Sequence, residues 1–309
     1  MSRSRAAATA AALAAVIVTL AGAPSVFAFC QTASCPVGGV ANTGARCTPT
    51  QESDCGTTLV WPSPCVGYSI QKDASKKTSF ATIEATVKQA FATWMAAECT
   101  GGGAPHVRLV ELEAVECHKH EYNQDAANAN TIMFRDDSWP YTGADNTLAL
   151  TTVTYNLDNG QIYDADMELN SATVTFTTGD TGVQFDLLSV LTHETGHFLG
   201  LAHSADHDAT MFPSYKPGET GLRSLSSDDI AGICTIYPPG AAIAATCDAT
   251  PRHGFSTLCK AQQETEESTT SGGCCAATPG AAADGGSQAA LAALTAALLA
   301  TRRRARARQ

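Results

Sequence analysis

The chain has 309 residues, with 19 Lys and Arg against 30 Asp and Glu and a formal net charge of −11. Seven of the basic residues lie near the two ends, and every acidic residue lies between them. This central segment is strongly acidic, which favours solubility and argues against nucleic acid as a partner. With the two ends set aside, the length suits about one domain of ordinary size.

The first 28 residues are typical of a secretory signal peptide. Arg3 and Arg5 precede an Ala/Leu/Val run, and Val26-Phe27-Ala28 resembles an A-x-A cleavage site. The alternative is a retained transmembrane anchor, but the apolar run is short and ends in Gly and Pro residues. The sequence therefore predicts export, with residues 1–28 removed.

Cysteine usage agrees with export. Ten of the 12 cysteines lie between Cys30 and Cys259, an even number that suits disulfides formed in an oxidising compartment. Residues 29–56 hold four of them and are predicted to form a Cys-rich N-terminal extension. Residues 239–260, with Cys247 and Cys259, are predicted to form a disulfide-containing C-terminal loop. Spacing alone leaves the pairing of these cysteines open.

Hydrophobic patterns between the extensions predict a mixture of helices and strands. Apolar residues recur at helical spacing over residues 79–97 and predict one helix. Runs rich in Val, Ile, Thr and aromatic residues predict strands at 66–70, 107–112, 131–134, 147–156 and 162–170. Two further helices are predicted, one beginning after Asp186 and one beginning at a Ser226–Asp229 capping box. This combination predicts an α+β fold with one helix behind an open sheet.

The helix after Asp186 carries the sequence H-E-T-G-H-F-L-G-L-A-H-S, from His193 to Ser204. His193 and His197 are four residues apart and therefore share one face of the helix. Gly200 can end the helix and turn the chain, which brings His203 back to the same point. Three histidines around one open position are the ligand set of a catalytic zinc, and they outweigh the alternative of surface histidines.

Glu194, next to the first histidine, is the candidate general base rather than a ligand. In this interpretation zinc polarises a scissile carbonyl and acidifies its water, and Glu194 takes the proton and later delivers it to the leaving amine. The sequence therefore predicts a zinc hydrolase that acts on peptide bonds.

The pattern H-E-x-G-H-x-x-G-x-x-H, followed by Ala209-Thr210-Met211-Phe212-Pro213, resembles the metzincin zinc endopeptidases. The segments M-F-P-S-Y and L-S-S-D-D-I-A-G-I resemble the matrixin branch, and the resemblance covers roughly residues 57–238. It implies a twisted mixed sheet, an active-site helix, and a small C-terminal subdomain after a turn bearing Met211, which lies beneath the zinc. It also implies that Pro213 and Tyr215 line a specificity pocket, and that an extended peptide lies along the strand at 147–156.

Some departures from that family bear on latency and on calcium. We find no segment like the matrixin pro-domain with its zinc-blocking cysteine, so latency by that route is not expected. Residues 163–168 resemble the calcium-binding strand of the family, but Met167 stands where a carboxylate is expected. Two interpretations stay open for Asp158, Asp164 and Asp166, namely calcium ligands, with Asp164 and Asp166 as the candidates, or a solvated acidic turn.

The C-terminal end has three parts. Residues 261–288 have the composition of a disordered linker and include Cys274-Cys275, and residues 289–309 combine an apolar run with five arginines. Together they resemble the C-terminal sorting signals of myxobacterial-type secreted proteins, which implies processing near these cysteines and retention at the cell surface. The alternative is an amphiphilic helical tail with no sorting role.

The sequence as a whole predicts a monomeric, secreted or surface-anchored zinc endopeptidase that acts on extracellular proteins. A surface binding or adhesion module on a protease scaffold is the alternative. The intact Glu194 and histidines argue against that alternative. Zinc-dependent hydrolysis of a non-peptide ester or amide also stays open.

Overall fold

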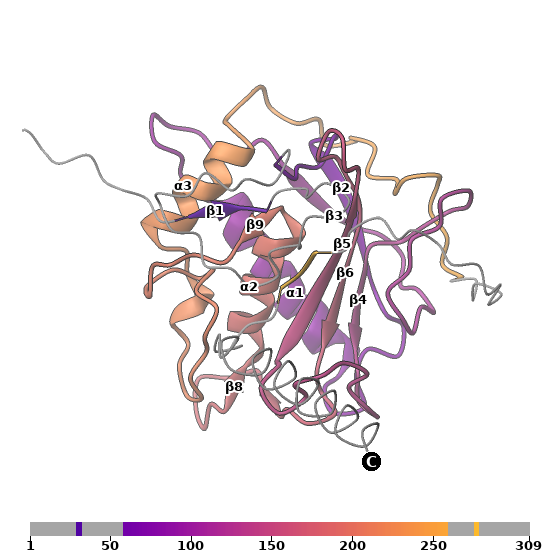
Figure 1. Cartoon of the computed structure of the whole chain (residues 1–309), viewed down its shortest axis with the longest axis vertical. Helices are drawn as coiled ribbons and strands as arrows, with labels where there is room; N and C mark the ends of the chain where they lie inside the picture. The colour runs from indigo at the N-terminus through magenta and orange to yellow at the C-terminus, as the bar shows by residue number, and fades with distance from the viewer. Residues whose placement is uncertain (1–28, 33–57, 259–274, 278–309) are drawn as a thin grey trace, which may run out of the picture.

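The computed structural model describes residues 29–32, 58–258 and 275–277 (Figure 1). The predicted signal peptide (1–28) and the tail at 289–309 lie outside these residues. Most of the Cys-rich extension and most of the predicted linker lie outside them as well.

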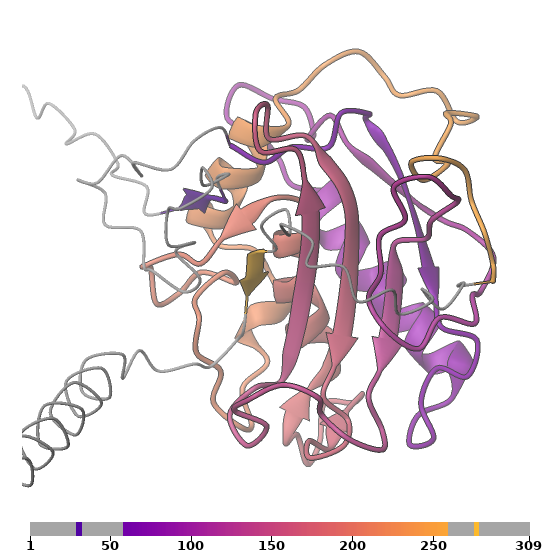
Figure 2. The same cartoon turned by 45° about the vertical axis from the view of Figure 1, so that its right-hand side comes forward.

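A six-stranded mixed sheet forms one layer of the molecule (Figure 2). Its strands stand in the order β10-β5-β6-β4-β2-β3. Their bounds are Cys65–Ile70 (β2), Arg108–Glu111 (β3), Thr131–Phe134 (β4), Ala149–Tyr155 (β5), Ile162–Leu169 (β6) and Cys275–Ala277 (β10). β2, β3, β4 and β6 are parallel, whereas β5 runs antiparallel to β6 and β10 runs antiparallel to β5. The five strands predicted from the sequence are confirmed, and so is the α+β class.

Two helices lie together on one side of this sheet (Figure 1). The helix α1 (Phe80–Met95) begins at Ser79, whose side chain accepts the backbone N–H of Thr82, and it buries the apolar stripe that the sequence predicted. The helix α2 (Leu187–Phe198) packs beside α1, and all of its residues are buried. α1 contacts the β2 and β3 side of the sheet, whereas α2 contacts β5 and β6. The indole of Trp94 on α1 donates to the carbonyl oxygen of Thr192 at 2.7 Å, which fixes the two helices against each other. Within the described residues, no helix has both the length and the apolar character needed to cross a bilayer.

The remaining elements lie around both ends of α2. They are β1 (Cys30–Gln31), β7 (Phe176–Thr177), β8 (Phe185–Asp186), β9 (Leu201–Ala202), the 3₁₀ turn η1 (Gly221–Arg223) and α3 (Ser227–Ile236). β1 pairs antiparallel with β9, and the backbone N–H of Phe29 donates to Asp228 on α3 at 2.8 Å. The capping box predicted for α3 is present.

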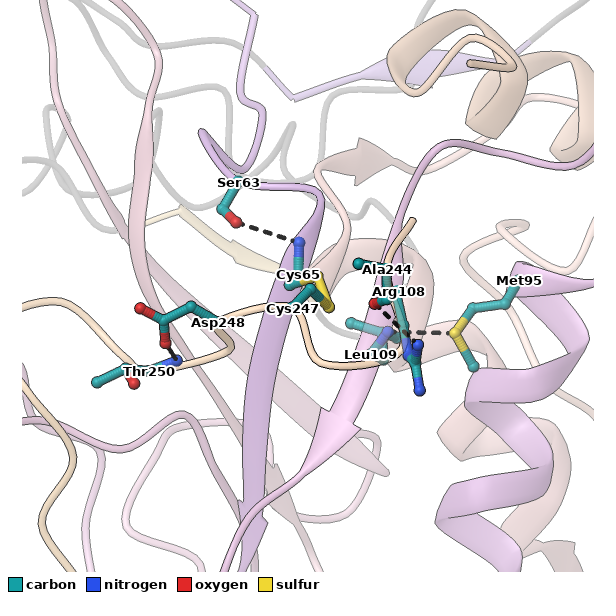
Figure 3. Close-up of a disulfide and its surroundings, with 9 residues drawn as sticks. All are labelled: Ser63, Cys65, Met95, Arg108, Leu109, Ala244, Cys247, Asp248 and Thr250. Atoms are coloured by element: carbon teal, nitrogen blue, oxygen red, sulfur yellow. Dashed lines mark hydrogen bonds between the residues drawn. A yellow bond between two sulfur atoms is a disulfide. The ribbon is translucent and has the colours of Figure 1, made fainter. Parts of the chain in front are cut away.

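Two disulfides connect distant parts of the chain. Cys99 is bonded to Cys234, and Cys65 on β2 is bonded to Cys247, across 135 and 182 residues respectively. Figure 3 shows the second bond, with the guanidinium of Arg108 donating to the carbonyl oxygen of Ala244 beside it. Residues 239–258 are therefore held against the sheet after α3. Cys117 is also disulfide-bonded.

A buried polar cluster lies around Glu168 of β6. The carboxylate of Glu168 is fully buried and accepts hydrogen bonds from Arg135 and Tyr141, and it lies 3.1 Å from Nδ1 of His120. Burial by itself would raise the pKa of Glu168, but these partners lower it. The hydrogen bond to Glu168 raises the pKa of His120. The cluster joins β6 to the segments that carry His120, Arg135 and Tyr141.

Candidate metal centre

Two of the predicted zinc ligands, His193 and His197, lie one turn apart on α2. Their Nε2 atoms are 3.1 Å apart, and both side chains are buried. The helix is positioned by its N-cap, because the carboxylate of Asp186 accepts the backbone N–H of Ser189 at 2.8 Å. The guanidinium of Arg223 pairs with the same carboxylate at 2.6 Å. Asp186 therefore fixes the start of α2 both as its N-cap and through an ion pair with Arg223. The sequence pattern predicted only the cap.

His203 reaches the same point because the chain turns back at Gly200. The φ angle of Gly200 is +95°, in the left-handed region that favours glycine. A Cβ at this position would also stand 2.7 Å from the carbonyl oxygen of Leu59. With this turn, the ligand nitrogens of the three histidines lie within 4.8 Å of one another. The structure thus brings together the three histidines that the sequence singled out.

Hydrogen bonds fix the tautomers of the two helical histidines. Nδ1 of His193 lies 2.7 Å from the carbonyl oxygen of Thr210, and Nδ1 of His197 lies 2.8 Å from that of Leu201. A carbonyl oxygen can only accept, so each Nδ1 carries the hydrogen and each Nε2 presents a lone pair. Carbonyl groups in this role orient metal-ligating histidines.

The site has the chemistry of a zinc site. Nε2 of His203 is buried and has no hydrogen-bond partner among the described residues, and the lone pairs on His193 and His197 face each other. Burial lowers the pKa of His193 to about 4 and that of His203 to about 3, and it lowers the pKa of His197 well below its usual value. All three imidazoles are therefore neutral at physiological pH, which is the form that binds a metal. A zinc ion fits this donor set.

Glu194 lies beside the histidines and is also buried. The hydroxyl of Thr151 on β5 donates to its Oε2 at 2.6 Å, whereas Oε1 has no hydrogen-bond partner among the described residues. Burial raises the pKa of Glu194 to about 8, although the hydrogen bond from Thr151 lowers it. A cation at the histidines would oppose the effect of burial and favour the carboxylate. Thr151 is a part of the site that the sequence pattern did not reveal, because the contact links residues 43 positions apart.

Met211 packs directly against the backbone of α2. A Cβ on Gly196 would stand 2.2 Å from the sulfur of Met211, so glycine is required for this close approach. Gly196 lies between the two helical histidines in sequence, so the thioether contacts the helix at the histidine pair.

Two aspartates at the start of α3 hold the loop that carries Met211. The carboxylate of Asp229 accepts the backbone N–H of Thr210 at 2.7 Å and that of Met211 at 3.0 Å. The carboxylate of Asp228 accepts the hydroxyl of Ser204 at 2.6 Å. Asp229 of the predicted capping box therefore also holds the Thr210–Met211 peptide, whose carbonyl oxygen orients His193.

The predicted pocket residues lie after this loop. Pro213 and Tyr215 are both buried, and the Tyr215 hydroxyl accepts the backbone N–H of Asp186 at 2.9 Å. The same hydroxyl donates to the carbonyl oxygen of Glu219 at 2.5 Å. Tyr215 therefore connects Asp186, at the start of α2, to Glu219. Its role in a pocket stays a prediction.

The predicted calcium residues lie on β6. Asp164 and Asp166 are both buried, so a solvated acidic turn is wrong for these two residues, whereas Asp158 is exposed in a turn. Asp166 accepts the backbone N–H groups of Thr131 at 2.7 Å and Glu121 at 3.0 Å, and burial raises its pKa to about 7. These backbone bonds satisfy the carboxylate without a cation, and calcium stays a prediction.

The mixed sheet, the buried helix with two histidines and the third histidine after a glycine turn define a zinc metalloendopeptidase domain of the metzincin type. The family model for Matrixin matches residues 60–238, more than half of the chain. The chain therefore belongs to the matrixin family, as its motifs indicated.

Several curated relatives match over part of their length. The chain is 32% identical over 180 residues to neutrophil collagenase from Homo sapiens, which covers 57% of this chain and 33% of that protein. It is 37% identical over 107 residues to metalloendoproteinase 1-MMP from Arabidopsis thaliana, covering 33% of this chain and 27% of the relative. It is 38% identical over 102 residues to matrilysin from Homo sapiens, covering 33% and 35%. The chain thus spans between 27% and 35% of the length of these relatives.

Proposed function

We propose that this protein is an exported zinc-dependent endopeptidase that hydrolyses peptide bonds of extracellular proteins, with Glu194 as the general base. The observation that carries the proposal is the convergence of three neutral histidines beside a buried carboxylate. Zinc, when bound by His193, His197 and His203, supplies Lewis-acid chemistry that polarises the scissile carbonyl and lowers the pKa of water.

The residues around Glu194 support its role as the base. Thr151 holds one carboxylate oxygen by a hydrogen bond and leaves Oε1 without a competing partner among the described residues. In the charged form that a neighbouring cation favours, the carboxylate accepts a proton from water and later returns it to the leaving amine. The buried setting excludes other water from this proton transfer.

A substrate that displaces β10 can pair with β5 on the side away from β6. Thr151 is a residue of β5, so a peptide chain that pairs with this strand passes beside Glu194. Backbone pairing of this kind binds an extended peptide, and side-chain pockets add specificity. This arrangement favours a peptide over a small ester or amide as substrate. Pro213 and Tyr215 remain our candidates for the wall of such a pocket.

Export is part of the proposal. Disulfides at Cys65 and Cys99 suit an oxidising compartment. Removal of a signal peptide after Ala28 would leave the amine of Phe29 as the chain terminus, at the carboxylate of Asp228. A charged amine would strengthen that hydrogen bond. The C-terminal sorting signal, anchoring at the cell surface, the monomeric state and calcium binding by Asp164 and Asp166 remain predictions.

The direct test compares the wild type with Glu194→Gln on a denatured protein mixture. The variant keeps the shape of the side chain and removes its basicity, so we expect zinc to stay bound and cleavage to fall by a factor of about 10² or more. The control is Glu98→Gln, which changes an exposed glutamate. If wild type binds one zinc but cleaves nothing, the alternative of a binding module is favoured. If Glu194→Gln cleaves as fast as the control, Glu194 is not the base.

A further inference from the structure

The strand β5 is not the edge of the described sheet, because β10 pairs with it. Residues 275–277 run antiparallel to β5, with Cys275 opposite Val153, Ala276 opposite Thr152 and Ala277 opposite Thr151. Figure 2 shows this short strand beside β5, on the side away from β6. Without β10, the outward N–H and C=O groups of β5 would be open to another chain.

The register places this strand at the candidate base. Ala277 is the partner of Thr151, and the hydroxyl of Thr151 donates to the Glu194 carboxylate at 2.6 Å. A segment of the chain's own C-terminal part thus lies along the edge where an extended peptide would bind. Its composition predicted only a linker, so the pairing depends on β5 rather than on a local strand preference.

We propose that residues 275–277 are an intramolecular competitor of extended peptides for the β5 edge of the active site. This inference rests on the proposed function, because residues 275–277 occupy the side of β5 where we expect the substrate to bind. A tethered segment acts at an effective concentration on the order of millimolar, so even weak pairing competes with free peptides. Only three residues pair, so a substrate that makes a longer strand can displace them. Release or proteolytic removal of this segment would raise activity.

The test uses full-length protein with Ala276→Pro and Ala277→Pro together. Proline has no N–H and disfavours a strand. Of two adjacent residues in a strand, one directs its backbone N–H toward the neighbouring strand, so replacing both residues removes the N–H group that points to β5. The matched control is Ala281→Pro with Ala282→Pro, the same change outside β10. Both pairs are made in the zinc-loaded Glu194→Gln background to prevent self-cleavage, and amide hydrogen exchange of residues 149–155 is measured. We expect faster exchange at alternate β5 amides in the first protein only, independent of protein concentration.

A second arm measures activity with Glu194 restored. We expect the 276/277 variant to cleave a peptide with kcat/KM raised about tenfold over the control, which corresponds to about 1.4 kcal/mol. Equal exchange of β5 in the two proteins overturns the proposal, even if both are active peptidases. Faster exchange in a protein that cleaves nothing supports the pairing and overturns the peptidase function instead. Protection that depends on protein concentration assigns the edge to a second copy and also overturns the intramolecular competitor.

Discussion

Replacement of Asp229 tests whether α3 holds the metal centre in place. The carboxylate of Asp229 is buried and accepts the backbone N–H groups of Thr210, Met211 and Ser226 at 2.7, 3.0 and 2.8 Å. Asp229→Ala leaves two buried donors and one part-buried donor without an acceptor, and each buried donor costs about 1–3 kcal/mol. Because such costs are not additive and some donors will find water, we expect a total loss of about 4 kcal/mol in the free energy of unfolding.

The loss should be visible in two assays. Urea unfolding followed by tryptophan fluorescence gives the free energy of unfolding, and a loss of about 4 kcal/mol lowers Tm by roughly 10 °C in a domain of this size. Zinc affinity should also fall, by about 10- to 100-fold, because the carbonyl group of Thr210 orients His193. Asp125→Ala, at an exposed aspartate, is the control. Equal stability and zinc affinity in the two variants would refute the coupling between α3 and the metal site.

Three further predictions follow from single contacts. Gly196→Ala places a Cβ 2.2 Å from the sulfur of Met211, so we expect it to cost about 1–3 kcal/mol in urea unfolding, and no loss would show that the thioether moves freely. Dialysis against a zinc chelator should abolish cleavage, and zinc added in stoichiometric amount should restore it. The contribution of the His120–Glu168 pair should depend on pH. The raised pKa of His120 stabilises the fold below its usual value of 6.5 and is lost as pH rises through the folded value, whereas the lowered pKa of Glu168 stabilises above 4.5 and is lost as pH falls. His120→Ala should therefore destabilise more near about pH 5.5 than near about pH 9, and an equal loss at both values would contradict the ion pair.

The sequence predicted the parts of the fold that depend on local pattern. The apolar stripe of α1, the Asp186 cap of α2, the turn at Gly200 and the capping box of α3 all involve residues within a few positions of one another. Such signals can be read from one chain because the interacting groups are near in sequence.

The long-range contacts of the fold and of the site could not be predicted in this way. Thr151 meets Glu194 across 43 residues, and Cys65 meets Cys247 across 182. The segment at 275–277 has a composition that favours a linker, yet it pairs with β5 as a strand. Tertiary partners decide these features, and a single sequence carries no short-range signal for them.

An X-ray absorption spectrum of the zinc-loaded protein tests the central claim most directly. The account predicts one zinc per chain with three nitrogen ligands at about 2.0–2.1 Å, from His193, His197 and His203, and one further light-atom ligand. Substitution of His203 by alanine should remove one of the three nitrogens, while Glu194→Gln should leave all three in place. A sulfur ligand at about 2.3 Å, or a protein that retains no zinc after desalting, would contradict the three-histidine site.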